Sequence, residues 1–491
     1  MEFLQSIWMF FQGNILTKPA FFVGLLVFIG YLLLKKPFYQ AYAGFVKATV
    51  GYLILNVASG GLVGTFRPIL AGLNQKFGLN AAVIDPYFGQ AAAEHAMEAV
   101  GRTTSLLFLG LLVAFFVNIV LVALRKVTKV RTLFITGHIM MQQSATGMWM
   151  IIYFFPQFQD ATAVIMLGLI LGVFWAVSSN LTVEVTQRLT DGGGFAVGHQ
   201  QMFGIWLVDK LAPKIGGKDA KQIEELELPG WLSIFSDNVV ATGTLMLLFF
   251  GVILYILGKD FLFAAVDEGG LGIANDGFSS FFFFVLNKSF HMAVYISILQ
   301  LGVRMFIAEL TESFTGISEK ILPGSVPAVD CAATYGFGSP NAPIVGFFFG
   351  ALGQFLAILG LVVFKSPILI ITGFVPVFFD NATFAVFANK ASGLKAAAIL
   401  TFCSGVIQVL FGAICASAFQ TYQYGGWHGN FDISTVWLAG GLLQKYLGII
   451  GYVVGIVVLL VIPQIQYSRD PEHCFQVVED WDAYKSSKGL A

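Results

Sequence analysis

Two short polar segments stand out in a chain that is otherwise strongly apolar. In ITGHIMMQQ, His138 and Gln142 are four residues apart and so project from one face of a helix. In DGGGFAVGHQQ, residues 191–201, three glycines precede His199 and Gln200. Such groups are costly at membrane depth and usually mark a pathway. They predict a neutral, hydrogen-bonding pocket for a small oxygen-rich ligand, lined by both segments. For His138 and Gln142, the alternative is a pair of helices whose polar side chains hydrogen-bond to each other. For His199 and Gln200, the alternative is a loop at the membrane interface.

A carboxylate in a third polar segment could complete this pocket. Asp330 lies in GSVPAVDCAATYGFGSPNAP, whose glycines and prolines indicate the broken helices of transporter binding sites. It could accept hydrogen bonds from a polyol or take a hydroxyl proton as a general base, and burial would raise its pKa for that task. The alternative is an ion pair with Arg304. Glu309 and Glu312 could bind a coupling cation, although ion pairs with Arg304 or Lys320 are the favoured interpretation.

An aromatic residue in IDPYFG is a further candidate. Tyr87 follows Pro86 and could form an aromatic wall or donate its hydroxyl, and a tyrosine at the membrane interface is the alternative.

The other four histidines are isolated and are interpreted as structural or solvated. The sequence contains no Walker motif, metal-ligand spacing or nucleophile triad, and DGGGF lacks the GK[ST] ending of a phosphate loop. We therefore expect no metal and no cofactor.

These residues require a membrane-embedded scaffold. Of the 491 residues, 57% are hydrophobic and 11% charged, against about 25% charged in soluble domains. Several apolar runs exceed the roughly 18 residues that span a bilayer, which predicts an all-α polytopic membrane protein rather than a barrel. The net charge of -1 provides no basic surface for nucleic acid. The four cysteines are interpreted as packing residues.

The apolar runs predict about eight clear spans and two or three broken ones. Residues 67–102 and 132–156 are too polar for simple spans and are expected to line a cavity or re-enter the membrane. Residues 1–16 are typical of an interfacial helix. The cations between Arg125 and Arg131 indicate the cytoplasmic side, as does the charged tail.

Weak self-similarity predicts an internal, inverted repeat. IDPYFG matches the region of VDCAATYGFG, and ITGH matches ITGF in the same order, so that Asp85 and Asp330 are counterparts. One integral membrane unit is expected over residues 1–491. Its parts are a first half (1–230), a second half (231–430), a last transmembrane helix (431–462) and a cytoplasmic tail (463–491).

Longer motifs resemble one known family. RTLFITGHIMMQQ, DGGGFAVGHQQMF, LPGWLSIFSDN, VRMFIAELTESFTGIS and AVDCAATYGF are similar to segments of the EIIC permease component of the bacterial phosphotransferase system for L-ascorbate. The resemblance implies a homodimer with about eleven spans per subunit, in which a core domain moves ascorbate past a dimerising gate domain by an elevator-like shift. The substrate contacts it implies are Pro86 with Tyr87, His138 with Gln142, His199 with Gln200, and Asp330. A hydroxyl residue is expected in relatives where Pro86 stands here, so one side-chain contact is lost.

The resemblance also implies partner proteins. A soluble EIIB with a phosphocysteine would phosphorylate bound ascorbate to L-ascorbate 6-phosphate, and EIIA, HPr and enzyme I would supply the phosphoryl group. The tail is too short for an EIIB domain, so EIIB is expected to dock separately near the loop 213–230 or the Arg125–Arg131 cluster. The expected location is the bacterial inner membrane. The alternatives are an ion-coupled symporter that uses Glu309, Glu312 or Asp330, and a structural scaffold.

Overall fold

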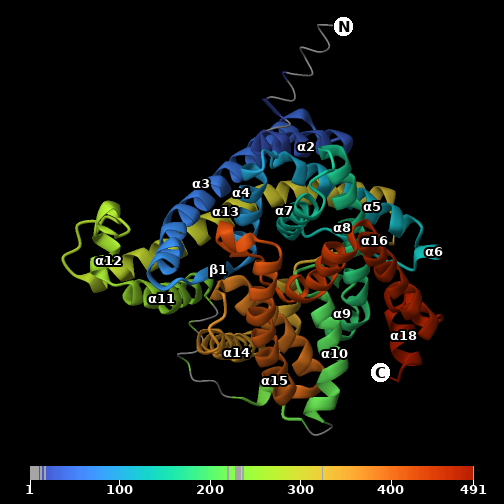
Figure 1. Ribbon diagram of the computed structural model, residues 1–491. Coiled ribbons are helices and arrows are strands. Elements are labelled where there is room, and N and C mark those ends of the chain that lie inside the picture. The colour runs from blue at the N-terminus through green and yellow to red at the C-terminus, as the bar shows by residue number, and fades with distance from the viewer. Residues whose placement is uncertain are drawn as a thin grey trace.

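Helices make up most of the protein, and two small parallel sheets lie between them (Figure 1). The computed structural model describes residues 10, 14–15, 18–217, 220–226, 230, 234, 237–322 and 324–489. The interfacial helix predicted for residues 1–16 lies almost entirely outside these ranges. Within them, six short strands interrupt the helices, so the expected all-α fold is correct only in the main.

Five helices form an elongated arm on one side of the molecule (Figure 1). They are α2 (Pro19–Leu33), α3 (Phe38–Phe77), α11 (Asn238–Leu257), α12 (Lys259–Phe263) and α13 (Phe281–Ile321). The long helices α3 and α13 pack along each other, and α2 lies against both. An exposed apolar stripe follows one side of α3, which suits contact with lipid or another subunit. It contains Phe38, Tyr42, Val46, Val50, Leu53 and Val57.

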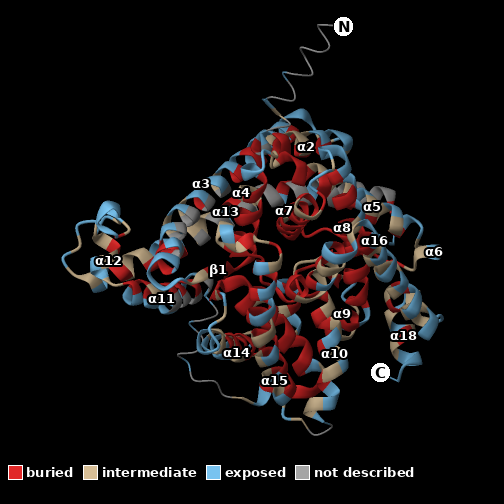
Figure 2. Cartoon of the chain, in the orientation of Figure 1, coloured by how far each residue is buried: buried red, intermediate tan, exposed pale blue. Residues whose placement is uncertain are grey.

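The remaining helices form the body of the molecule, where most of the buried residues lie (Figure 2). They are α4 (Pro86–Ala99), α5 (Ser105–Ala123), α6 (Arg125–Thr128), α7 (Gly137–Phe154), α8 (Asp160–Leu181), α9 (Val183–Thr190), α10 (Met202–Gly216), α14 (Ala342–Val363), α15 (Asn381–Ala418), α16 (Phe431–Arg469), α17 (His473–Glu479) and α18 (Trp481–Ser487). Helices α5, α7 and α8 pack together, α16 lies against α8, and α14 packs along α15. Short helical turns lie between these helices: η2 (Ile223–Glu225), η5 (Cys331–Phe337), η6 (Pro376–Asp380) and η7 (Thr421–Tyr424). A further turn, η4 (Val266–Glu268), lies between α12 and α13 of the arm.

Two long helices are broken at glycines. In α15 the break lies at Ser392 and Gly393, where Gly393 has a φ of 72°, and in α16 it lies at Gly448, with a φ of 57°. A positive φ favours glycine because it has no side chain. The sequence placed broken segments in residues 132–156 and around Asp330, so neither of these two breaks was predicted.

Six helical stretches of the described chain are long and apolar enough to cross a membrane. They are Phe38–Ala58, Ser105–Ala123, Asp160–Thr190, Ala342–Val363, Pro376–Ala418 and Phe431–Arg469. Shorter apolar helices cover Ala20–Leu33 and Thr242–Leu257. These stretches support a multi-pass membrane protein. The total of about eleven spans and the division into core and gate domains stay predictions.

Each sheet has a central strand between two partners from distant parts of the chain. The strands are β1 (Asn80–Ile84), β2 (Thr132–Phe134), β3 (Ala196–Val197), β4 (Val326–Val329), β5 (Ile368–Thr372) and β6 (Gly426–Trp427). Their orders are β5-β1-β6 and β2-β4-β3, with all pairs parallel. In both sheets an aspartate follows the central strand and caps the next helix: Asp85 accepts from the Tyr87 N–H at 3.0 Å, and Asp330 from the Ala332 N–H at 2.8 Å. The internal repeat itself stays a prediction.

The C-terminal helices α17 and α18 cover the sheet β2-β4-β3. Val477 and Tyr484 are buried in one cluster with Val326 and Ala328 of β4. The Trp481 indole N–H donates to the Asp191 carboxylate at 2.9 Å and ties α18 to the end of α9. The tail therefore packs against the sheet β2-β4-β3 and supports it.

Candidate functional site

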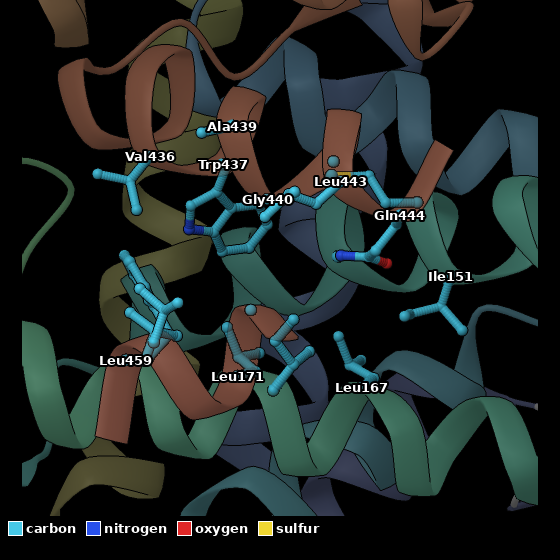
Figure 3. A pocket seen from close by; sticks show the side chains of 17 residues that line it. Ile151, Leu167, Leu171, Val436, Trp437, Ala439, Gly440, Leu443, Gln444 and Leu459 are labelled. Carbon is cyan, nitrogen blue, oxygen red and sulfur yellow. The ribbon is translucent and has the colours of Figure 1, made fainter. Parts of the chain in front are cut away.

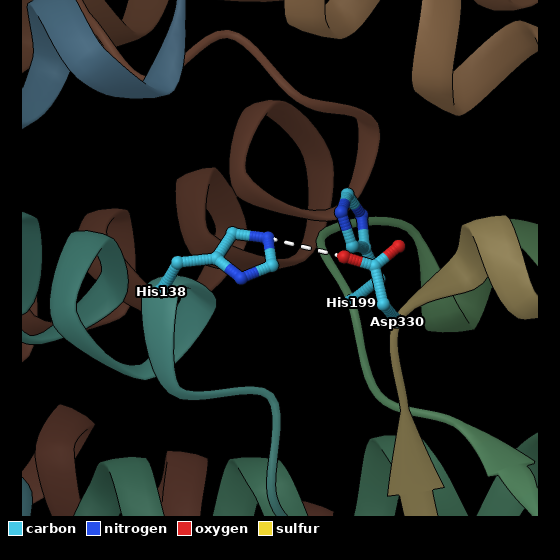
Figure 4. Close-up of side chains that lie close together, drawn as sticks. All are labelled: His138, His199 and Asp330. Carbon is cyan, nitrogen blue, oxygen red and sulfur yellow. Dashed lines mark ion pairs between the residues drawn. The ribbon is translucent and has the colours of Figure 1, made fainter. Parts of the chain in front are cut away.

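Strands β2, β3 and β4 bring three ionisable side chains together. His138 lies in the first turn of α7 after β2, His199 follows β3 after Gly198, and Asp330 follows β4 directly. Because neighbouring parallel strands end at the same edge of a sheet, these residues meet there. Figure 4 shows the three side chains next to one another. We call His138, His199 and Asp330 the site cluster.

The site cluster is compact but not closed on all sides. His138 Nε2 lies 3.2 Å from Asp330 Oδ2, the pair joined in Figure 4. The His138 and His199 ring centroids are 6.0 Å apart. His199 is buried, whereas the side chains of His138 and Asp330 keep 23% and 38% of their surface accessible. A small ligand can therefore reach the imidazole and the carboxylate together. The structure thus joins the three polar segments that the sequence singled out.

A chain of buried amides supports the site cluster. Gln200 Nε2 donates to Gln142 Oε1 at 2.9 Å, and Gln143 Nε2 donates to Gln200 Oε1 at 2.8 Å. The Trp175 indole N–H donates to Gln143 Oε1 at 2.7 Å. Gln142 and Gln200 thus satisfy part of each other's hydrogen-bonding capacity. This agrees with the alternative in which polar side chains of neighbouring segments pair with each other. The sequence analysis missed Gln143, although its amide in the same apolar helix was a signal of equal strength.

Gln201 sets the tautomer of His199. The Gln200 N–H donates to Gln201 Oε1 at 2.9 Å, and Gln201 Nε2 donates to Thr383 Oγ1 at 3.1 Å, so the amide orientation is fixed. Gln201 Oε1 then lies 2.6 Å from His199 Nδ1. Because a carbonyl oxygen only accepts, Nδ1 carries the proton. In the neutral imidazole, Nε2 therefore presents its lone pair.

Two buried carboxylates behind the site cluster join loops from distant parts of the chain. Asp432 accepts from the backbone N–H groups of Phe203 and Gly204 at 2.8 and 3.0 Å, at the start of α10. Asp380 accepts from Asn430 Nδ2 and from the Phe431 N–H, both at 2.7 Å. Backbone N–H groups at a helix start favour a negative charge. The sequence analysis gave neither residue a place in the site, although a carboxylate inside an apolar segment is itself a signal.

The environment of Asp330 differs from the expected one. Burial raises the pKa of its carboxyl, but the hydrogen bond from His138 and the nearby His199 imidazole outweigh burial and hold that pKa below its usual range. The expectation of a raised pKa is therefore wrong, because it did not include the two histidines. An ionised carboxylate is a good hydrogen-bond acceptor and a weak base.

Pro86 and Tyr87 lie at the start of α4, next to the other sheet. Proline suits this first helical position, because its missing N–H would have no partner within the helix. Both residues are buried, and α4 packs against α7, the helix that carries His138. This places them on an element next to the site cluster. Their contact with a substrate stays a prediction.

The glycine-rich half of DGGGFAVGHQQ does not line the site. Asp191 adopts the left-handed conformation at the end of α9, and Gly192 and Gly194 also have positive φ. A Cβ at Gly192 would lie 2.5 Å from the Trp481 ring. The glycines thus form a surface turn against the tail, and the prediction that they line the pocket is wrong. The HQQ half is buried, as predicted.

The acidic pair on α13 is already neutralised. Glu309 accepts from the Tyr31 hydroxyl at 2.6 Å and from Lys47 Nζ at 2.9 Å, and Glu312 pairs with Lys36. The favoured interpretation as ion-paired residues is confirmed with Lys36 and Lys47 as partners. The side chains of residues 304 and 320 lie outside the described part of the chain. Two carboxylates with lysine partners make a poor site for a coupling cation.

A cavity of about 180 Å³ lies elsewhere, between α7, α8 and α16 (Figure 3). Apolar side chains such as Leu167, Leu171, Trp437 and Leu459 form most of its lining, with Gln444 among the few polar ones. It therefore does not suit a ligand with many hydroxyl groups. The site cluster is the better candidate.

Close backbone packing makes Gly198 a test of the site geometry. A Cβ there would lie 2.7 Å from the Ala328 carbonyl oxygen of the neighbouring strand. We expect Gly198→Ala to separate β3 from β4 and destabilise the protein by about 1–3 kcal/mol. The thermal unfolding midpoint of the purified protein in detergent should fall by several degrees.

Gly360→Ala in α14 is the matched control, because among the described residues no atom beyond the surrounding turns of its own helix lies within 4 Å of the added Cβ. This change should leave the unfolding midpoint unchanged or slightly raised, since alanine favours helix. Equal midpoints for Gly198→Ala and the wild type would contradict the close strand approach.

Comparison with known proteins identifies the family of the chain. The family model described as PTS system sugar-specific permease component, EIIC-GAT, matches residues 14–440. The chain is also similar to the "Ascorbate-specific PTS system EIIC component" of Mycoplasma pneumoniae, with 35% identity over 438 residues. This match covers 82% of the chain and 65% of the relative, so the chain spans about two thirds of that protein's length. The chain belongs to the family of PTS system sugar-specific permease components.

Proposed function

We propose that the protein binds L-ascorbate at the site cluster and moves it inward while a partner converts it to L-ascorbate 6-phosphate. The family and the relative named as ascorbate-specific support this substrate. The observation that carries the proposal is the convergence of His138, His199 and Asp330 with buried glutamines at one sheet edge.

The chemistry of the site cluster suits a small ring with several hydroxyl groups. The Asp330 carboxylate accepts hydrogen bonds from hydroxyls, and the imidazoles of His138 and His199 can donate or accept. Gln142 and Gln200 add amide donors and acceptors, and their mutual hydrogen bond keeps them ordered before substrate arrives. Pro86 and Tyr87 would supply a wall from α4.

We assign the proton of the reacting hydroxyl to the His138–Asp330 pair. The pKa of the Asp330 carboxyl is lowered, so this residue alone is a weak base. A carboxylate held against an imidazole instead orients the ring and stabilises its protonated form. His138 would accept the hydroxyl proton while the oxygen attacks the phosphocysteine phosphorus of EIIB and the cysteine sulfur leaves. Asp330 thus acts through His138 rather than as the base itself.

The proposal includes the partners and the movement that the family resemblance implies. EIIB would dock on the cytoplasmic face, near residues 213–230 or the Arg125–Arg131 cluster, and would be recharged through EIIA, HPr and enzyme I. The C-terminus would be cytoplasmic and the membrane a bacterial inner membrane.

The apolar stripe on α3 is a suitable surface for lipid or for a second subunit of a homodimer. An elevator-like shift of the core against the gate would carry the substrate.

Uptake of labelled ascorbate into membrane vesicles tests the coupling. We expect uptake to require phosphoenolpyruvate and the soluble phosphotransferase proteins, and to continue when an ionophore collapses the ion gradients. Uptake abolished by the ionophore but indifferent to phosphoenolpyruvate would support the symporter alternative instead. The ion-paired state of Glu309 and Glu312 argues against that alternative.

A further inference from the structure

The site cluster also has the composition of a transition-metal site. Its three side chains each offer one ligand atom, and these atoms all lie within 4.8 Å of one another (Figure 4). The ligands come from α7, the β3–α10 loop and the residue after β4, so no short spacing in the sequence could reveal them. Two imidazoles and one carboxylate suit Zn²⁺ and similar ions, whereas Mg²⁺ and Ca²⁺ prefer oxygen ligands alone.

The separations require only a small movement of one side chain. Zinc bonds of about 2.0–2.1 Å place neighbouring tetrahedral ligands about 3.3 Å apart. His138 Nε2 and Asp330 Oδ2 are 3.2 Å apart, close to that value. His199 must therefore move toward this pair, and one coordination position stays open. The partly accessible side chains of His138 and Asp330 show that an ion can enter.

The surroundings prepare the ligands for a metal. Gln201 Oε1 accepts from His199 Nδ1 at 2.6 Å and leaves Nε2 as the ligand atom. Gln201 is fixed in turn by Thr383 and by the Gln200 N–H. The Ala332 N–H donates to Asp330 Oδ1 at 2.8 Å and orients the carboxylate. Such outer hydrogen bonds are typical of metal sites and set the ligand tautomer and direction.

We propose that His138, His199 and Asp330 bind one Zn²⁺ per chain and that the bound ion excludes the transported substrate. Both would use the same three side chains, so zinc would act as a competitive inhibitor. Zn²⁺ is also the cleanest probe, because it has no redox chemistry. Ascorbate would reduce Cu²⁺ or Fe³⁺. Zinc binding itself does not depend on the proposed substrate.

Calorimetric titration of the purified full chain with Zn²⁺, in a non-chelating buffer and without ascorbate, tests the proposal. We expect one site per chain in the wild type and at least a tenfold loss of affinity in His199→Ala and in Asp330→Asn. His291→Ala, which removes an exposed histidine on α13, is the matched control and should bind zinc as the wild type does. A wild type that binds no zinc overturns the proposal without any variant. Equal affinities in all four proteins would place the ion elsewhere and overturn it too.

A second titration adds ascorbate to the wild type, corrected for zinc binding to ascorbate alone. We expect the apparent zinc affinity to fall as ascorbate rises. If ascorbate leaves the zinc affinity unchanged, the proposal that zinc and ascorbate share one site is wrong. Ascorbate binding without zinc, measured in parallel, separates this result from the proposed function. If zinc fails to bind but ascorbate binds, only the metal proposal is lost.

Discussion

Asp330→Asn should reduce phosphoenolpyruvate-driven ascorbate uptake by about 100- to 10,000-fold, the range attributed to a positioned acid–base group. Ascorbate binding should weaken by less than about tenfold, because asparagine keeps a hydrogen-bond acceptor of the same shape. What is lost is the negative charge that stabilises protonated His138, 3.2 Å away. Vesicle uptake and equilibrium binding on the same preparation measure the two effects separately.

The fold should survive this substitution. Asparagine caps helices about as well as aspartate, so the hydrogen bond from the Ala332 N–H can be kept. Asp237→Asn is the matched control, because Asp237 caps α11 through the backbone N–H groups of Val239 and Val240. It should leave uptake unchanged within about twofold. Unimpaired uptake in Asp330→Asn would remove Asp330 from the transfer step.

The sequence was most informative where a residue type conflicted with its surroundings. His138, His199 and Asp330 were found because imidazole and carboxylate groups are costly inside an apolar chain. These signals are local and can be read without a partner segment.

What the sequence could not show depends on pairing between distant segments. Strands β3 and β6 are two residues long, too short for a pattern, and they form only against β4 and β1. The same limit hid the partners of Glu309 and Glu312, because Lys47 lies on α3 and Lys36 in the connection between α2 and α3, both near the start of the chain. The DGGG turn was misplaced because Gly192 packs against Trp481 of the C-terminal tail rather than at the site.

His199→Ala should weaken ascorbate binding by about 10- to 150-fold. A hydrogen bond that involves a charged group contributes about 1.5–3 kcal/mol, and each 1.4 kcal/mol is a factor of ten in affinity. The substitution also removes the donor to Gln201 Oε1 and the aromatic contact with Phe379, so a pre-ordered site becomes looser. Equilibrium binding of labelled ascorbate to the purified protein measures the loss.

Two comparisons separate a binding role from a structural one. His291→Ala removes an exposed histidine whose Nδ1 contacts only its own helix at Asn287, and it should bind ascorbate as the wild type does. His199→Gln keeps a donor and an acceptor at the site and should recover part of the lost affinity, with an unfolding midpoint close to that of the alanine variant. His199→Met, close to glutamine in volume but without its amide, should not recover the affinity. Recovery by glutamine and not by methionine identifies a direct polar contact, because packing alone would respond to volume in both variants. Wild-type affinity in His199→Ala would place ascorbate elsewhere. Ascorbate binding that is lost in this variant would exclude the scaffold alternative.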